Sequence, residues 1–342
     1  MFTGLIAKRK TLLYAFVILL LITTIAFILY KKRGVTKVIR TPKKVVIAYV
    51  NTLHSTLVQI AWKKGFFKDE ALDITLMPHT HGKTALEAVL AGNADIATVA
   101  ATPVMFNIVK GEKIYVLSSI LNSGKVNVMI ALKDKGISDV AGFSGKTIGI
   151  TRGTTSEYFL YLFCLIHGIK YDGLKFIDKK PEEMLELLTG GQVDAVSTWQ
   201  PFATLILKKL SNKVKVFDGE GIYSENFYFV AKQSFVHSDP EVIERVLSAM
   251  YKAEQYIKKE PEKSQEIIAD SVRIDQALIK EIWDLYNFEL NLDQYFVSSL
   301  ETVTQWAIME KKVSITNMPD YLEYVYHDGL KKINPYSITL IQ

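Results

Sequence analysis

Residues 190–201 read GGQVDAVSTWQP, and the chain carries a similar segment, GNADIATVAATP, at residues 92–103. In each copy a glycine ends a helical pattern, an aspartate follows, and a short apolar run predicts a buried strand. A proline then closes the copy, where it suits the first turn of a new helix. Both copies predict helix, turn, strand, loop and helix, so the chain is expected to contain two similar α/β lobes.

The ends of the two predicted strands are the first place to expect a binding site. In an open and mostly parallel sheet, ligands bind beyond the carboxyl ends of the strands. Residues 100–102 and 198–200 follow the strands of the two copies directly. Two lobes built in this way would share one ligand between them.

Length and charge narrow the class of protein. A chain of 342 residues exceeds one ordinary core and suits two lobes. The net charge of +5 arises from residues 1–44, which hold ten bases and no acid, whereas the remainder holds 31 bases and 36 acids. Because no basic stripe with interleaved aromatic residues occurs in that remainder, we expect no nucleic-acid partner. Cys164 is the single cysteine, which excludes an intramolecular disulfide.

Residues 11–30 form an uncharged apolar run with basic residues on both sides. Its length suits a transmembrane helix, and no small-residue cleavage site follows it. We therefore predict an uncleaved anchor and a basic linker over residues 1–43, with the lobes outside the cell membrane. The charges conflict with this orientation, since seven basic residues follow the run and three precede it.

The alternation of strands and helices predicts how the lobes divide. Strand and helix patterns alternate from residue 44 and again from residue 147, and helices follow almost to the end. We predict residues 44–131 and 228–342 as lobe 1 and residues 132–227 as lobe 2. Two crossings near Ala131 and Phe229 would form a hinge. The late helices are expected at residues 240–259, 262–269, 275–288, 293–311 and 319–332.

Hydroxyl groups and an indole ring are the main site candidates. Thr154, Thr155 and Ser156 stand where a strand leads into a helix, so their hydroxyls and the first free N–H groups can face one anion. A plain helix N-cap explains them as well. Trp199 is expected to form a wall of the site, although it could also pack the lobe. The full predicted set is Asn51, His54, Thr80, Thr102, Thr154, Thr155, Ser156 and Trp199.

The sequence contains no motif that we assign to catalysis, a cofactor or a metal. Asp95 and Asp194 each follow a glycine turn, so hydrogen bonds within the turn explain them better than acid–base chemistry. A metal site could be considered at His54, His79 and His81, but no nearby carboxylate or thiol completes its set of ligands. A neutral hydrogen-bonding role remains open for His54 or His81.

The order of several short motifs resembles that of a known family. The motifs are Gly82 with Gly92, Asp95 and Pro103, then FSGKTIG at 143–149, GTTS at 153–156, GQVDA at 191–195 and WQPF at 199–202. They look like those of the solute-binding proteins of ABC importers, in particular the binders of nitrate, alkanesulfonates, taurine and thiamine-pyrimidine precursors. The resemblance runs from about residue 44 to residue 311. It implies a type II periplasmic-binding fold, a ligand in the cleft, and a membrane permease and an ATPase as partners on separate chains.

Two departures from this family bear on function. A lipid-anchor cysteine is usual in members of Gram-positive type, and this chain has an apolar run without one. The related thiamine-pyrimidine synthase depends on a cysteine-rich segment, which a chain with one cysteine lacks. The main hypothesis is a membrane-anchored, non-catalytic receptor for a small anionic ligand. Thiamine-pyrimidine-precursor binding or synthesis on the same fold and a sensory ligand-binding module remain the alternatives.

Overall fold

The computed structural model describes residues 18–21, 23–24 and 41–341. Residues Met1–Thr41 and Pro42–Gln342 form two separate units, and the second contains both sheets. Most of the predicted anchor and basic linker lies outside the described residues. Within the described part, no helix is both long and apolar enough to cross a membrane.

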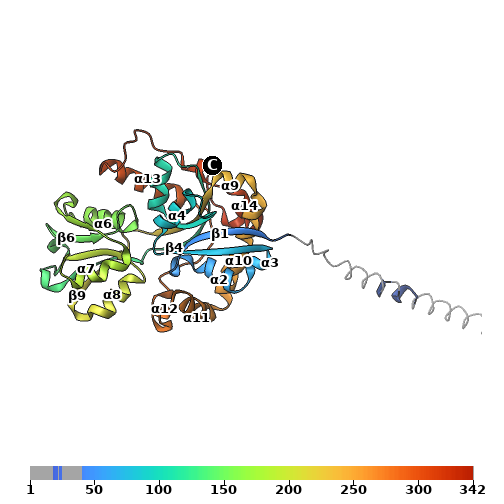
Figure 1. Ribbon diagram of the computed structural model, residues 1–342, viewed down its shortest axis with the longest axis horizontal. Helices are drawn as coiled ribbons and strands as arrows, with labels where there is room; N and C mark the ends of the chain where they lie inside the picture. The colour runs from blue at the N-terminus through green and yellow to red at the C-terminus, as the bar shows by residue number, and fades with distance from the viewer. Residues whose placement is uncertain (1–17, 22, 25–40, 342) are drawn as a thin grey trace, which may run out of the picture. The chain divides into compact units, whose positions relative to one another are not determined.

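The first sheet holds five strands in the order β2-β1-β3-β10-β4. Figure 1 labels β1 and β4 of this sheet. β1 runs parallel to β2 and β3, whereas β10 runs antiparallel to β3 and β4. All five residues of β3 are buried, as expected for a strand with both faces covered. The strand bounds are β1 Lys43–Val50, β2 Leu72–His79, β3 Ile96–Ala100, β4 Ile114–Ser123 and β10 Glu225–Lys232.

The second sheet repeats this plan in the order β7-β6-β8-β5-β9. β6 runs parallel to β7 and β8, and β5 runs antiparallel to β8 and β9. The strands of the two similar stretches, β3 and β8, occupy the same central place in their sheets, so the predicted repeat is confirmed. The bounds are β5 Asn127–Leu132, β6 Thr147–Ile150, β7 Lys175–Asp178, β8 Ala195–Trp199 and β9 Val214–Asp218.

The repeated aspartates make the same contacts in both sheets. Asp95 Oδ2 accepts a hydrogen bond of 2.7 Å from the backbone N–H of Val46. Asp194 Oδ2 accepts one of 2.8 Å from the N–H of Thr147. Each carboxylate thus joins the turn before a central strand to the neighbouring strand, so both residues have a structural role, but through bonds between strands and not through the predicted bonds within the turn.

The two lobes are joined by residues 124–126, between β4 and β5, and residues 219–224, between β9 and β10. Ala131 lies in β5 and pairs with Ala195 of the second sheet, while Phe229 lies inside β10 and pairs with Thr98 of the first. The crossings therefore lie earlier than the predicted positions near these two residues. β5 joins the second sheet through its pairing with β8 and β9, which sequence alone does not show.

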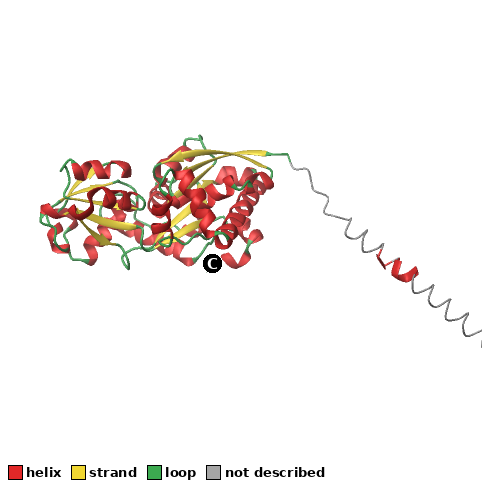
Figure 2. Ribbon diagram, turned by 90° about the horizontal axis from the view of Figure 1, so that it is seen from below, coloured by secondary structure: helices red, strands yellow, loops and turns green. Residues whose placement is uncertain are grey.

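Helices pack around both sheets (Figure 2). The longest described one, α10, begins with Pro240 after an N-cap at Asp239, whose side chain accepts from the N–H of Val242. The helix bounds are α2 Thr56–Lys63, α3 Phe66–Asp69, α4 Gly82–Leu90, α5 Ala101–Val109, α6 Thr155–Ile166, α7 Met184–Thr189, α8 Phe202–Leu210, α9 Gln233–Ser238, α10 Pro240–Lys259, α11 Pro261–Val272, α12 Gln276–Trp283, α13 Gln294–Met309 and α14 Asp328–Ile333.

The predicted helix over residues 319–332 is wrong. A 3-10 turn at Tyr321–Tyr324 comes first, and α14 begins only at Asp328. Between them, Val325 bridges to Val116 of β4, and the N–H of Tyr326 donates to Val116 O at 3.0 Å. The chain is extended here because it pairs beside the sheet, which a helix could not do.

Candidate functional site

A small cavity lies between the lobes, where strands of both sheets end. Val50, Ala100 and Trp199, the last residues of β1, β3 and β8, all line it. Its volume is about 20 Å³, which is room for about one water molecule. The complete lining is Val50, His54, His81, Gly82, Lys83, Ala100, Pro103, Thr154, Thr155, Trp199, Glu225 and Phe227.

Three helices begin at this cavity. Gly82 opens α4, Ala100 is the N-cap of α5, and Thr154 is the N-cap of α6. The first N–H groups of a helix have no partner within it, and the helix dipole places partial positive charge at the same end. Lys83 adds a full positive charge to the lining. This side of the cavity therefore favours a negatively charged group.

Several polar atoms around the cavity are buried without a hydrogen-bond partner in the described part of the chain. They include His54 Nε2, His81 Nδ1 and Thr155 Oγ1, all from residues of the lining. Buried polar groups in proteins are nearly always paired, so unpaired ones are informative. Three of them on one small cavity indicate that it is built to bind a polar molecule.

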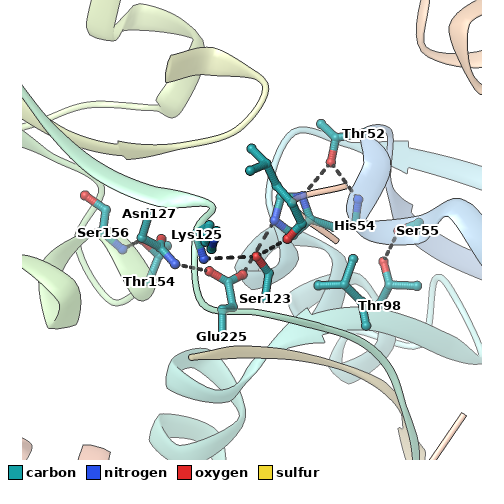
Figure 3. Close-up of polar contacts among 12 residues, drawn as sticks. Thr52, His54, Ser55, Thr98, Ser123, Lys125, Asn127, Thr154, Ser156 and Glu225 are labelled. Atoms are coloured by element: carbon teal, nitrogen blue, oxygen red, sulfur yellow. Dashed lines mark hydrogen bonds and ion pairs between the residues drawn. The ribbon is translucent and has the colours of Figure 1, made fainter. Parts of the chain in front are cut away.

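His54 lies on the 3-10 turn Leu53–Ser55, directly after β1. Its Nδ1 is 2.9 Å from Thr52 Oγ1, and its Nε2 faces Glu225 Oε1 at 3.6 Å (Figure 3). The imidazole packs against the ring of Phe227 at 5.0 Å between centroids. Burial lowers the pKa of His54 to about 3, so its ring is neutral at physiological pH.

Glu225 opens β10 and links the two lobes. Its Oε2 accepts a hydrogen bond of 2.7 Å from Asn127 Nδ2, on β5 of the second sheet (Figure 3). The side chain is only 3% exposed. Burial raises the pKa of Glu225 to about 7, against the opposing effect of the Asn127 hydrogen bond. A carboxyl group that titrates near neutral pH therefore lines the cavity.

Four of the predicted site residues line the cavity, namely His54, Thr154, Thr155 and Trp199. Thr154 Oγ1 donates to Thr151 O at 2.6 Å and accepts from the N–H of Ser156 at 3.3 Å, so it caps the helix. Thr155 Oγ1 has no described partner. Trp199 is 6% exposed and packs edge to face on Phe202.

The other four predicted residues are not part of the lining. Ser156 Oγ donates to Ser197 O at 2.8 Å and accepts from the N–H of Thr151, so it joins strands of the second sheet. Asn51 Oδ1 accepts from the hydroxyl of Tyr49 at 3.3 Å. Thr80 is exposed, and Thr102 is fully buried.

Sequence reasoning missed three polar residues at the site. Lys83 follows the helix start at Gly82, so its position at a helix N-terminus could have indicated it. Glu225 and Asn127 carry no such signal, because they meet only through the pairing of strands from different lobes.

Two further contacts hold the lobes together. Lys83 Nζ donates to Arg152 O at 3.3 Å, and Lys312 Nζ donates to Glu157 Oε1 at 2.7 Å. Glu157 is 3% exposed and also accepts from the N–H of Gly153 at 2.8 Å. With these contacts formed, any ligand larger than water requires the lobes to move apart.

A larger groove of about 590 Å³ lies beside the crossings, between α6 and α13. Aromatic and other uncharged side chains line it, including Tyr158, Tyr161, Tyr295 and Trp306. We assign the site to the smaller cavity because charged groups and helix N-termini converge there. Among the described residues, no group of three or more His, Cys, Asp or Glu side chains could hold a metal ion.

Comparisons with known proteins identify relatives of this chain and its fold. A Bacillus subtilis protein named for aliphatic sulfonate binding is 25% identical over 229 residues, which is 65% of this chain and 68% of the relative. The alkanesulfonate-binding protein SsuA from Xanthomonas axonopodis pv. citri, solved bound to MOPS, is 14% identical with a TM-score of 0.73, over 84% of this chain and 99% of SsuA.

The same fold also occurs in an enzyme. The desulfurization enzyme DSZB is 11% identical with a TM-score of 0.61, over 87% of this chain and 99% of the enzyme. The family model described as NMT1/THI5 like matches residues 51–264, which is more than half of the chain. The chain therefore belongs to the NMT1/THI5-like family and has the two-sheet α/β fold of periplasmic binding proteins.

Proposed function

We propose that this chain is the solute-binding receptor of an ABC importer and that its ligand carries a small anionic group. The observation that carries the proposal is the meeting of three helix N-termini and Lys83 at one cavity between the lobes. The sulfonate ligands named for the Bacillus subtilis relative and for SsuA support the same ligand chemistry.

Binding and release follow from the two crossings. Residues 124–126 and 219–224 connect the lobes, and rotation about such a pair of segments opens and closes a cleft. In the open state a ligand reaches the N-termini of α4, α5 and α6. Closure then brings the lobes together around the ligand and shields it from water, whereas the full contacts of Lys83 with Arg152 and of Lys312 with Glu157 belong to the form whose cavity holds no ligand.

The importer supplies the rest of the transport function. The permease and ATPase would be separate chains, and residues 11–30 would anchor the receptor outside the cell membrane near the permease. We assign no catalytic role, because the Bacillus subtilis relative and SsuA are both named as binding proteins. Thr155 is expected to contact the anion directly, since its hydroxyl lies at the start of α6 without a described partner.

Ligand titration of the full-length chain in detergent tests this proposal. Calorimetry with alkanesulfonates, short carboxylates and nitrate should find at least one anion that binds and changes tryptophan fluorescence. Thr155→Ala should weaken that binding about tenfold, the loss expected when one hydrogen bond to a charged group disappears. Thr316→Ala, at an exposed threonine, serves as the control. Binding of uncharged solutes alone, or unchanged affinity of the Thr155 variant, would overturn the proposal.

A further inference from the structure

We propose that the groove between α6 and α13 is a second binding site, and that it takes an uncharged aromatic molecule carrying a hydrogen-bond acceptor. This inference goes beyond the proposed function, because the groove and the cavity between the lobes share no lining residue. It therefore holds whether or not the cavity binds an anion.

The groove is formed by two helix faces and by both crossings. Its lining residues on α6 and on α13 recur at intervals of three or four positions, which places each set on one face of its helix. The crossings contribute Gly124 and residues 221–224. The volume of about 590 Å³ lies within the range of small-molecule sites. The two helix faces comprise Tyr158, Tyr161, Leu162 and Leu165 on α6, and Ser298, Thr302, Gln305 and Met309 on α13.

Two buried hydrogen-bond donors of the lining have no partner in the part of the chain that the structure describes. They are the indole N–H of Trp306, a residue that is 1% exposed, and the hydroxyl of Tyr223, which is 8% exposed. Buried polar groups are nearly always paired. An indole N–H only donates, and burial raises the pKa of Tyr223 well above its usual value of about 10, so its hydroxyl keeps its proton. Both groups therefore need an acceptor, which a bound molecule can supply.

Aromatic rings of the lining contact one another. The ring centroid of Tyr158 lies 5.1 Å from that of Trp306 and 5.4 Å from that of Tyr223, and Tyr161 lies 6.1 Å from Trp306. Such a cluster offers ring faces and edges to a further ring. Leu165 belongs to the same lining and is 61% exposed, so a bound aromatic molecule would cover apolar surface that water contacts.

The charge of the groove differs from that of the cavity. None of its described lining residues carries a charge, whereas Lys83 and Glu225 line the cavity. The Lys312 ammonium lies 5.2 Å from the ring centroid of Trp306, but it is paired with the Glu157 carboxylate. Burying an ion without a partner is costly, so the groove favours an uncharged molecule.

Two uncharged aromatic probes, coumarin and naphthalene, locate the site on the full-length chain in detergent. Saturation-transfer NMR titrations, corrected by titrations of detergent alone, should show that both bind. Leu165→Asp should weaken both by about tenfold or more, because it places a charge beside the apolar groove. Ile166→Asp is the matched control, since Ile166 is 54% exposed, follows Leu165 directly and does not line the groove.

Tyr223→Phe tests the acceptor, because only coumarin carries a carbonyl group. The variant should bind coumarin about fivefold more weakly, the effect of losing one uncharged hydrogen bond. Its affinity for naphthalene should stay the same, which also shows that the variant is folded. Tyr336→Phe, at a tyrosine that is 91% exposed, should bind both probes as the unmodified protein does.

The same measurements can overturn the inference. Absence of coumarin binding, or equal effects of Leu165→Asp and Ile166→Asp, would show that the groove is not the site. Equal changes for the two probes in Tyr223→Phe would refute the acceptor. Sedimentation velocity without probe tests a different occupant: a dimer that Leu165→Asp dissociates would show that a second copy of the chain fills the groove. The receptor function stands or fails separately, by its own anion titration.

Discussion

Replacing Glu225 by glutamine should change the pH dependence of folding stability even without ligand. Burial raises the pKa of this carboxyl group from 4.5 to about 7 in the folded state. The folded protein therefore binds more protons than the unfolded chain between these values, and the stability contribution of Glu225 is fully present below pH 4.5 and is lost as pH rises through 7. A pKa rise of this size corresponds to about 3 kcal/mol, an upper value.

The measurement is the difference in unfolding free energy between the unmodified protein and Glu225→Gln, from urea titrations at pH 5, 6, 7 and 8. The variant should gain stability relative to the unmodified protein as pH rises, by about 2 to 3 kcal/mol over the range. The titration of His54 occurs in both proteins and drops out of the difference. The unfolding free energy of the control variant Glu262→Gln, at an exposed glutamate, should change with pH in the same way as that of the unmodified protein. A difference for Glu225→Gln that stays constant from pH 5 to pH 8 would refute the reasoning.

Three further substitutions test other parts of the structure. Ser156→Ala removes a hydroxyl that joins two strands and should cost about 1 to 3 kcal/mol of stability, measurable by urea unfolding. Lys312→Met breaks the ion pair with Glu157 and should favour open lobes, so the radius of gyration from small-angle scattering should increase; an unchanged value contradicts this. Gly82→Ala places a Cβ only 2.8 Å from Val99 Cα and should cost about 1 to 3 kcal/mol, whereas Gly173→Ala, which meets nothing closer than 3.8 Å, should unfold at the unmodified temperature.

The fold was predictable where local patterns determine it. The two similar stretches indicated the central strands β3 and β8, and the Asp239–Pro240 pair indicated the start of α10. Contacts distant in sequence decided the rest. β5 belongs to the second sheet because it pairs with β8 and β9. Val325 is extended because it bridges to Val116.

The candidate site, too, could be predicted only in part from local patterns. Thr154 and Thr155 follow the end of β6, and Trp199 is the last residue of β8, so the rule for parallel sheets selected residues that line the cavity. That rule could not show which hydroxyl can bind a ligand. The hydroxyl of Ser156 cannot, because it donates a hydrogen bond to Ser197 O on β8. Glu225 stands at the beginning of an antiparallel strand, where the rule does not apply, and its approach to Asn127 depends on both crossings.

The position of β10 inside the first sheet also affects how this chain folds during synthesis. β10 lies between β3 and β4, yet it begins at residue 225, about 100 residues after β4 ends at residue 123. At about 5 to 20 residues per second, a ribosome needs roughly 5 to 20 s to make that segment. Through this interval β3 presents an unpaired edge and β4 has no strand beside it, which is the condition under which strands of neighbouring nascent chains can pair. A holdase chaperone that covers residues 96–123 would protect the chain until β10 arrives.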